Sequence, residues 1–330
     1  MSTVTCTSAA SAAWTHAPAS PPVTARSMSG KRRCLPLTRL RDRRRQPERS
    51  TGQLSRPELP LLLAHRGSPT VNRPENTVSA AIAALRRGAD GVEVDVRASA
   101  DGRLLCSHDP DLFRLAGVRM SLAANSAESL RRVRLHGGHA VALLEELLSA
   151  VARHGRYRVV VEAKECGDRG AADRLAAALR RVLGQYDAVL DLTVSSFDAT
   201  LLARIRASLT DVEVRTALLG STFASGAELL RHAAIEGHDE IHPHFRTLLR
   251  EPGVAEAARL LGIGVTCWTV NRPRDVERLG ALGVNAVITD DVGGVRAALQ
   301  SGTGLIDRKA CEPIVDLASR VLAARAEQRR

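Results

Sequence analysis

Short apolar runs alternate with helical patterns from residue 60 to residue 301. The apolar runs are rich in Leu and β-branched residues, and they predict strands at 61–65, 91–97, 104–108, 158–164, 192–196, 212–218, 240–244, 265–270 and 286–289. Most gaps between them carry apolar residues at helical spacing, which predicts helices at 77–87, 143–154, 171–183, 199–208, 227–236, 254–261, 274–282 and 294–300. Strands that alternate with helices indicate a parallel sheet covered by helices.

One connection differs from the others. Asp101-Gly102 is a tight-turn signal and predicts that the strands at 91–97 and 104–108 form a hairpin. Counting the hairpin as one stave with an extension leaves eight β/α units. This number suits a (β/α)8 TIM barrel with a small hairpin insertion after the second strand. No GxGxxG turn follows the first strand, which argues against a dinucleotide-binding fold.

The strand at 91–97 alternates strictly between apolar and charged residues. Val92, Val94 and Val96 share one face, whereas Glu93 and Asp95 share the other. A solvated antiparallel strand would show the same pattern. In a parallel sheet covered by helices, however, both faces should be apolar, and two inward carboxylates are costly unless a cation lies between them. The pattern therefore favours a functional site.

Composition and charge suggest where this barrel begins and ends. The 330-residue chain is 44% hydrophobic and 25% charged, enough to bury one large core or two modest ones, and it has no apolar run of membrane-spanning length. Residues 1–58 contain eleven Lys and Arg against three Asp and Glu, so they carry most of the net charge of +11. We predict a disordered basic tail at 1–58, the barrel at 59–301 and a helical tail at 302–330.

The cysteines and the tail bear on location and partners. Six widely spaced cysteines form no CxxC pair, which suggests neither a zinc site nor a disulfide framework. Residues 1–58 lack the continuous apolar segment of a secretory signal. A reducing cytoplasm is the simplest location. The basic tail predicts at most weak contact with a membrane surface and no specific nucleic-acid partner.

Polar residues gather at the carboxyl ends of the predicted strands, where a β/α barrel carries its reacting groups. Glu93, Asp95 and Glu162 supply three carboxylates without a His or Cys beside them. Carboxylate oxygens suit a hard cation, so we predict one Mg²⁺ or Ca²⁺ rather than zinc. The alternative is a structural salt-bridge network of these carboxylates with Arg66 and Lys164.

Two histidines and two cations accompany the carboxylates. His65 and His108 come from separate strands, and two imidazoles flanking a substrate could act as general base and general acid near neutral pH. Arg66 and Lys164 would bind and neutralise an anion. Together with a metal ion, these residues indicate chemistry at a phosphoryl ester.

Further polar residues near the strand ends could have structural or functional roles. Asn76 is a good N-cap for the helix predicted at 77–87. Glu75 could tie down the site loop or touch the substrate. His242 and His244 alternate on one strand and could face the barrel mouth.

These motifs resemble the glycerophosphodiester phosphodiesterase family over residues 61–300. The likeness rests on His65-Arg66-Gly67, Pro74-Glu75-Asn76-Thr77, Glu93-Val94-Asp95, Asp101-Gly102, His108-Asp109, Val161-Glu162-Ala163-Lys164, Ser195-Ser196-Phe197-Asp198, Trp268-Thr269-Val270-Asn271 and residues 283–290. The segment HDPDLFRLAG, which begins at His108, departs from the pattern because it lacks the Arg-Thr-Thr often found there.

The resemblance implies a TIM barrel that hydrolyses glycerophosphodiesters to glycerol 3-phosphate and an alcohol. It also implies the roles of the site residues: metal binding at Glu93, Asp95 and Glu162, acid and base roles for His65 and His108, phosphate contacts from Arg66 and Lys164, and a substrate-lining Trp268.

Two alternatives remain open on the sequence. A lysophospholipase D acting on lipid-tailed diesters would need an apolar groove beside the barrel mouth, for which Leu112, Phe113 and Phe223 are candidates. A non-catalytic module that binds phosphate or nucleic acid would rely on the basic tail at 1–58.

Overall fold

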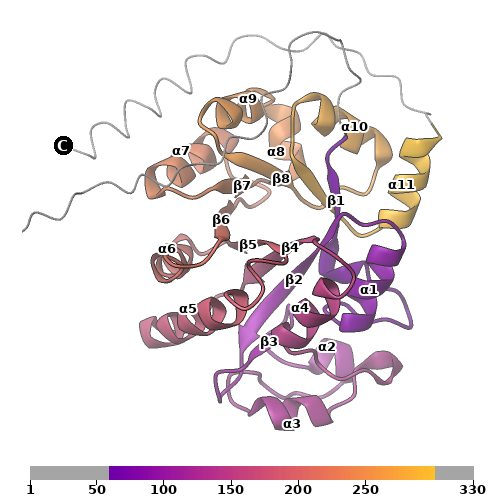
Figure 1. The fold of residues 1–330 in the computed structure, drawn as a ribbon, viewed down its shortest axis with the longest axis vertical. Coiled ribbons are helices and arrows are strands. Elements are labelled where there is room, and N and C mark those ends of the chain that lie inside the picture. Colours follow the sequence, from indigo (N-terminus) through magenta and orange to yellow (C-terminus); the bar gives the residue numbers. More distant parts are fainter. Residues whose placement is uncertain (1–58, 302–330) are drawn as a thin grey trace, which may run out of the picture. The chain divides into compact units, whose positions relative to one another are not determined.

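The computed structural model describes residues 59–301, so the tails predicted at 1–58 and 302–330 lie outside the described residues. Within this range eight parallel strands close into a barrel, because β1 pairs with both β2 and β9 (Figure 1). The strands of the ring are β1 (Leu61–Ala64), β2 (Gly91–Ala98), β4 (Arg158–Ala163), β5 (Asp191–Ser196), β6 (Val214–Leu219), β7 (Glu240–His242), β8 (Gly264–Cys267) and β9 (Ala286–Thr289). The predicted TIM barrel is confirmed.

The predicted hairpin is also present. Strand β3 (Leu104–Cys106) pairs antiparallel with β2 outside the ring, with Val96 opposite Cys106 and Ala98 opposite Leu104. Gly102 in the connecting turn has a φ of 73°, a left-handed conformation that glycine adopts without steric cost. The hairpin lets β2 extend beyond its parallel neighbours and carry the chain out to an insertion.

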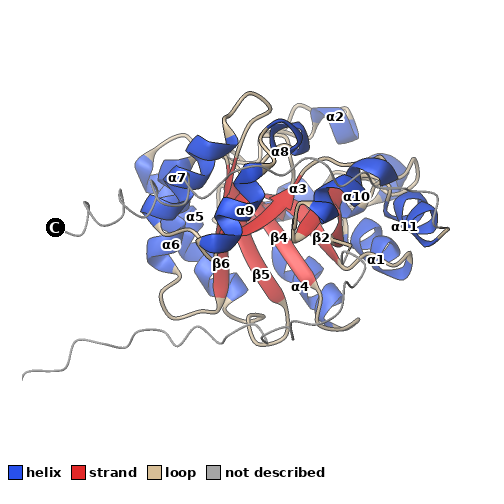
Figure 2. Ribbon diagram, turned by 90° about the horizontal axis from the view of Figure 1, so that it is seen from above, coloured by secondary structure: helices blue, strands red, loops and turns tan. Residues whose placement is uncertain are grey.

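Helices cover the outer face of the strands, as the two views of Figures 1 and 2 show. Each helix predicted within residues 59–301 is present: α1 (Val78–Arg86), α4 (Leu144–Ala152), α5 (Arg169–Leu183), α6 (Ala199–Ser208), α7 (Gly226–Glu236), α9 (Gly253–Leu260), α10 (Pro273–Ala281) and α11 (Val292–Gln300). Val92, Val94 and Val96 are fully buried in the core between strands and helices. The other face of β2 therefore points into the barrel, as its alternation predicted.

Short elements outside the regular alternation of strands and helices escaped prediction. They are α2 (Phe113–Ala116), α3 (Ala127–Arg132), α8 (Phe245–Arg250) and the single 3-10 turns η1 (His65–Gly67) and η2 (His136–Gly138). One or two turns are too short to show a helical period. Some strands also end before their predicted limits. Trp268, for example, was predicted within a strand but belongs to the loop that follows β8.

The segment between β3 and α4 has a core of its own. Leu112, Leu122 and Leu130 are buried against Leu105 and Leu143, separately from the main core. This insertion, residues 107–143, contains α2 and α3. Burying one large apolar side chain contributes about 1.5–3 kcal/mol of stabilising free energy. Several such side chains are enough to hold this short segment in a defined conformation.

A second polar group lies inside the barrel near the amino ends of the strands. This lower cluster consists of Arg158, Arg215, Glu240 and His242. Glu240 forms ion pairs with Arg158 and, at 2.8 Å, with the Nε of Arg215, and it accepts a hydrogen bond of 3.1 Å from His242 Nε2. Burial alone would raise the pKa of Glu240, but the Arg158 charge and the His242 hydrogen bond hold it far below its usual range. Arg215 also pairs with Asp191, so every charge in the cluster has a partner of opposite sign.

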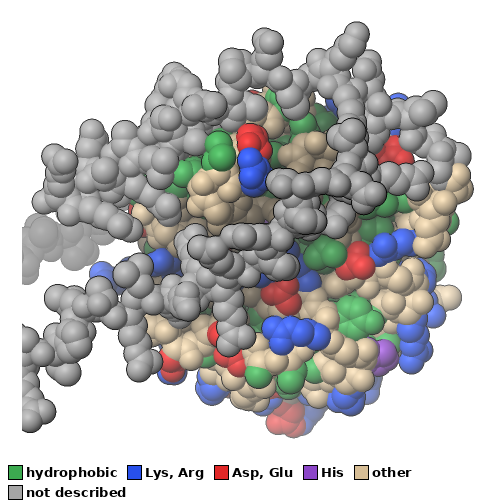
Figure 3. Space-filling view, turned by 45° about the horizontal axis from the view of Figure 1, so that its top comes forward, with side chains coloured by type: hydrophobic (Ala, Val, Ile, Leu, Met, Phe, Trp, Pro, Cys, Tyr) green, Lys and Arg blue, Asp and Glu red, His purple; other side chains and the backbone are tan. Residues whose placement is uncertain are grey.

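The outer surface of the described residues is mixed in charge. Basic and acidic side chains are interspersed on the face drawn in Figure 3. Exposed ion pairs such as Arg180–Asp211 and Arg259–Glu256 contribute to this pattern. Among residues 59–301, no helix has the length and apolarity needed to cross a bilayer.

Candidate active site

The first part of the site is a strained turn directly after β1. Arg66, Gly67 and Ser68 all have positive φ, a conformation that costs free energy for residues other than glycine. A Cβ on Gly67 would lie 2.7 Å from the backbone nitrogen of Ala81, so this position must be glycine for α1 to pack closely. The turn directs the Arg66 backbone N–H at Glu93 Oε2, 3.0 Å away. The strain thus places Arg66 and His65 around one carboxylate.

Three carboxylates meet inside the barrel at the carboxyl ends of β2 and β4. Glu93, Asp95 and Glu162 each offer an oxygen, and these oxygens all lie within 4.8 Å of one another. The register explains the meeting, because Asp95 pairs directly with Glu162 across the two parallel strands. Lys164 bridges two of them, with its Nζ 2.7 Å from Asp95 and in close contact with Glu162.

The charges of the three carboxylates are unevenly compensated. Burial, and next the charge of Asp95, raise the pKa of Glu93 to about 8. The same two causes raise the pKa of Glu162. Burial would also raise the pKa of Asp95, but the charges of Lys164 and Arg66 hold it below its usual value. Among the described residues Glu93 has no cationic side chain as an ion-pair partner. An all-oxygen donor set with one uncompensated carboxylate fits a hard divalent cation.

Each of the two predicted histidines has a carboxylate partner. His65 Nδ1 donates to Asp290 Oδ1 at 2.6 Å, and His108 Nδ1 donates to Asp109 Oδ1 at 2.7 Å. A carboxylate can only accept, so it fixes the proton on Nδ1 and leaves Nε2 for a substrate. Burial lowers the pKa of His65, but the Asp290 hydrogen bond and the charge of Glu93 outweigh it and raise the pKa overall.

Glu75 resolves one of the open readings of the sequence. Its carboxylate accepts hydrogen bonds from Arg66 Nη1 at 3.0 Å and from two nitrogens of Arg114. Glu75 therefore ties down the site loop. Arg66 is also held by Asp95, whose Oδ2 lies 3.3 Å from its Nε.

The prediction that Asn76 caps the first helix is wrong. The N-cap of α1 is Thr77, whose side chain accepts from the backbone of Ala80. Asn76 is buried with a φ of 58°, and it donates to Asp95 Oδ2 while accepting from the Asp95 backbone N–H. Local capping preference lost to a long-range hydrogen-bond pair, because a buried carboxylate gains more from satisfied oxygens than a helix end gains from one cap.

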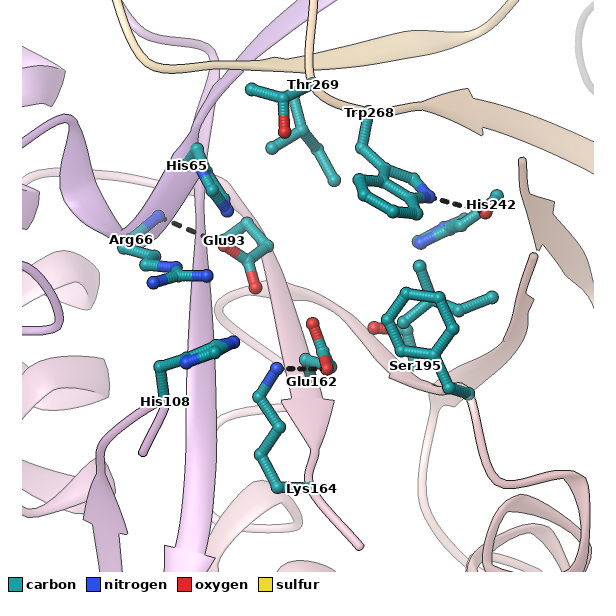
Figure 4. A pocket seen from close by; sticks show the side chains of 13 residues that line it. His65, Arg66, Glu93, His108, Glu162, Lys164, Ser195, His242, Trp268 and Thr269 are labelled. Carbon is teal, nitrogen blue, oxygen red and sulfur yellow. Dashed lines mark hydrogen bonds and ion pairs between the residues drawn. The ribbon is translucent and has the colours of Figure 1, made fainter. Parts of the chain in front are cut away.

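These residues line one cavity of about 260 Å³, shown in Figure 4. His65, His108, Glu93 and Lys164 converge on it from one side, and Trp268 forms part of the opposite wall (Figure 4). All the residues predicted as catalytic, metal-binding or substrate-binding line this cavity except Asp95. Asp95 contacts the lining residue Lys164, whose Nζ lies 2.7 Å from its carboxylate. The structure thus brings the predicted site residues together.

Aromatic side chains support the Trp268 wall. The Trp268 ring makes edge contacts with Phe197 and His244, at distances between ring centroids of 5.5 and 5.3 Å. Its Nε1 donates to the backbone oxygen of His242. The His242 side chain is fully buried and contributes to the cavity lining, whereas His244 caps α8. Of the two histidines expected at the barrel mouth, only His242 therefore lines the cavity.

The apolar groove expected for a lipid-tailed substrate does not form from its candidate residues. Leu112 is 1% exposed and belongs to the insertion core. Phe113 and Phe223 are exposed, the latter at 94%, and neither lines the cavity. The sequence had identified these residues as apolar, but apolar character alone cannot tell a groove from a core.

Sequence reasoning gave no role to Asp290 or Arg114. Asp290 directly follows β9, so the strand-end rule that identified His65 would have found it too. Arg114 carries no comparable signal, since its partner Glu75 is 39 residues away in the chain. Only the fold brings these two residues together.

The chain matches the model of the glycerophosphoryl diester phosphodiesterase family over residues 65–294. Among curated proteins it is 30% identical over 264 residues to a probable glycerophosphodiester phosphodiesterase 1 of Mycobacterium tuberculosis, covering 74% of this chain and 93% of that protein. It is 26% identical over 241 residues to a glycerophosphodiester phosphodiesterase of Caldanaerobacter subterraneus subsp. tengcongensis, covering 70% and 94%.

Solved structures agree with the fold. The glycerophosphodiester phosphodiesterase of Thermotoga maritima superposes with a TM-score of 0.59 at 26% identity, covering 73% of this chain and 99% of that one. An Oleispira antarctica phosphodiesterase, solved in complex with the product sn-glycerol-3-phosphate, gives a TM-score of 0.63 at 24% identity, covering 73% and 97%.

Proposed function

The chain belongs to the glycerophosphoryl diester phosphodiesterase family, and we propose that it hydrolyses glycerophosphodiesters with one divalent cation and two histidines. It is a phosphoric diester hydrolase. In this proposal the products are glycerol 3-phosphate and an alcohol, in keeping with the product bound by the Oleispira enzyme. Glu93, Asp95 and Glu162 would hold Mg²⁺ or Ca²⁺, which would supply Lewis-acid activation of the phosphoryl group.

One observation carries the proposal. Two carboxylates of the triad, Glu93 and Glu162, line the same cavity as two histidines, each of which is oriented by its own carboxylate. A purely structural salt-bridge network would pair every buried carboxylate with a cation. Within residues 59–301, Glu93 instead accepts only a backbone N–H, and its pKa is raised to about 8. The arrangement is therefore short of positive charge at the place where a metal ion would supply it.

The side chains divide the chemistry between them. Arg66 and Lys164 bind the non-bridging phosphate oxygens and oppose the charge that develops there. One imidazole Nε2 removes the proton of the attacking hydroxyl as its oxygen bonds to phosphorus. The other donates a proton to the leaving alcohol oxygen as the P–O bond breaks. If water attacks, this step yields glycerol 3-phosphate directly. If a glycerol hydroxyl attacks, it yields a cyclic phosphate, which water then opens while the two histidines exchange roles. Trp268 packs against the substrate.

Turnover of glycerophosphocholine tests the proposal. Wild type should lose activity in EDTA and regain it with Mg²⁺ or Ca²⁺, and Glu93→Gln or His108→Ala should lower kcat by about 1,000-fold or more. Glu165→Gln is a matched control, because this exposed carboxylate lies beside Lys164 in sequence and makes no side-chain contact in the site. Unchanged turnover in EDTA would exclude the cation, and unchanged turnover in His108→Ala would exclude the two-histidine mechanism.

A further inference from the structure

Arg114 joins two loops of the site. Its Nε donates to Asp109 Oδ2 at 2.5 Å, while its Nη1 and Nη2 donate to the two oxygens of Glu75 at 2.9 and 2.6 Å. Asp109 follows β3, whereas Glu75 lies in the loop between β1 and α1. One guanidinium therefore uses three of its donors to connect segments that are far apart in the chain.

Each carboxylate held by Arg114 also holds a residue of the cavity. The other oxygen of Asp109 orients His108 through Nδ1 at 2.7 Å, and Glu75 Oε1 accepts from Arg66 at 3.0 Å. The contacts form one continuous series, His108–Asp109–Arg114–Glu75–Arg66. Its two ends are the proton-transferring imidazole and the phosphate-binding guanidinium of the proposed mechanism.

The insertion gives Arg114 a fixed base. Arg114 lies in α2, next to the buried Leu112, and Leu115 and Ala116 pack against the insertion core. A second arginine, Arg97 on β2, donates to the backbone oxygen of His108 at 2.9 Å. The segment that carries His108 is thus held at its backbone by the barrel and at its side chain by the insertion.

We propose that Arg114 is a positioning residue that sets the distance and orientation between His108 and Arg66. The inference rests on the proposed roles of these two residues. A planar guanidinium can hold Asp109 and Glu75 at once, whereas a lysine ammonium at the same position cannot reproduce both arms of the fork. In this role Arg114 touches no substrate itself. Its loss acts by displacing His108 and Arg66, and a displacement of about 1 Å in a catalytic group can reduce a rate by about 100-fold.

Arg103 provides a matched control. Both arginine side chains are 46% exposed, and Arg103 forms an ion pair with Glu145 on α4, away from the cavity. In Arg114→Ala the largely buried Glu75 keeps its ion pair with Arg66, so both variants should fold, and their unfolding temperatures verify this. Any difference in activity between the two variants then reports on position rather than folding.

Steady-state kinetics on glycerophosphocholine test the inference. Arg114→Ala should lower kcat about 10- to 100-fold and raise KM, because the link that sets the two ends of the series relative to each other is lost. Arg103→Ala should behave as wild type. Arg114→Lys should recover less than half of the lost activity, and guanidinium ion added to Arg114→Ala should restore part of kcat. Kinetics of Arg114→Ala within twofold of Arg103→Ala would overturn the inference.

Double variants show whether Arg114 acts through its carboxylate partners. Adding Arg114→Ala to Asp109→Asn, or to Glu75→Gln, should cost less than the product of the single effects. Fully multiplicative losses would also overturn the inference. Failure of the proposed mechanism is separate, since it appears as normal turnover in His108→Ala. An inactive His108→Ala beside a normal Arg114→Ala refutes only the positioning role.

Discussion

The barrel interior contains two polar clusters that differ in charge balance. At the carboxyl ends of the strands, Glu93, Asp95 and Glu162 face the two cations Arg66 and Lys164. In the lower cluster one carboxylate, Glu240, faces two arginines and a histidine. Both clusters arise from the same alternation of inward and outward residues along the strands.

The same residue type behaves differently in the two clusters. Glu93 and Glu240 are both buried inward glutamates, yet the pKa of Glu93 is raised to about 8 and that of Glu240 is strongly lowered. Burial acts in the same direction on both, so the difference comes from neighbouring charges: Asp95 for Glu93, and Arg158 for Glu240. Burial of a charge therefore does not by itself indicate function. An excess of negative charge beside an open cavity is what indicates function.

Stability should separate the clusters most strongly. Glu240→Gln should reduce the free energy of unfolding by about 3–5 kcal/mol, because it leaves Arg158 buried without a counter-charge. Glu93→Gln should change it by less than about 1 kcal/mol, since a carboxyl with a pKa of about 8 is mostly neutral at pH 7. Urea unfolding measures both values.

The cost of Glu240→Gln should depend on pH. Because folding lowers the pKa of Glu240, its contribution is present above the unfolded pKa of about 4.3 and is lost as the pH falls below it. Equal destabilisation by the two Gln variants at pH 7 would mean that the two clusters are not distinct in kind.

An added divalent cation should stabilise the folded protein only through the carboxylates Glu93, Asp95 and Glu162. At a concentration 100-fold above Kd, Mg²⁺ or Ca²⁺ should raise the free energy of unfolding by about 2.7 kcal/mol in wild type and much less in Glu162→Gln. Affinity should increase from pH 6 to pH 8, because Glu93, with its pKa of about 8, must lose a proton to bind. Calorimetry at the two pH values measures this. Equal affinity at both would argue against Glu93 as a ligand.

The smallest expected effect concerns the partner of His65. Asp290→Asn replaces a charged acceptor that raises the pKa of His65 by a neutral amide, so one inflection of the kcat/KM profile should move to lower pH. The maximal rate should fall about tenfold, because the ring loses its fixed tautomer. Asp291→Asn is the control, as Asp291 caps α11 and does not contact His65. A pH profile unchanged from wild type would contradict the role given to Asp290.

Much of the fold could be predicted because its signals are local. The alternation of Val92, Glu93 and Val94 already shows which side of β2 faces the barrel interior. The helices with several turns were predicted almost residue by residue, whereas α2 and α8 were missed because one or two turns show no period. Asn76 was misassigned for a related reason: local preference describes helix caps but not a hydrogen bond to a strand 19 residues away.

The sequence by itself determined the barrel, the family resemblance and most of the polar residues that line the cavity, since strand periodicity and strand-end position can be read from neighbouring residues. Tertiary structure alone decided the partners. His65 meets Asp290 across 225 residues because closure of the sheet sets β1 beside β9. Folding of the insertion likewise brings Arg114 to Glu75, and barrel closure surrounds Glu240 with arginines. Electrostatic environment depends on distance in space, and sequence periodicity carries no information about that distance.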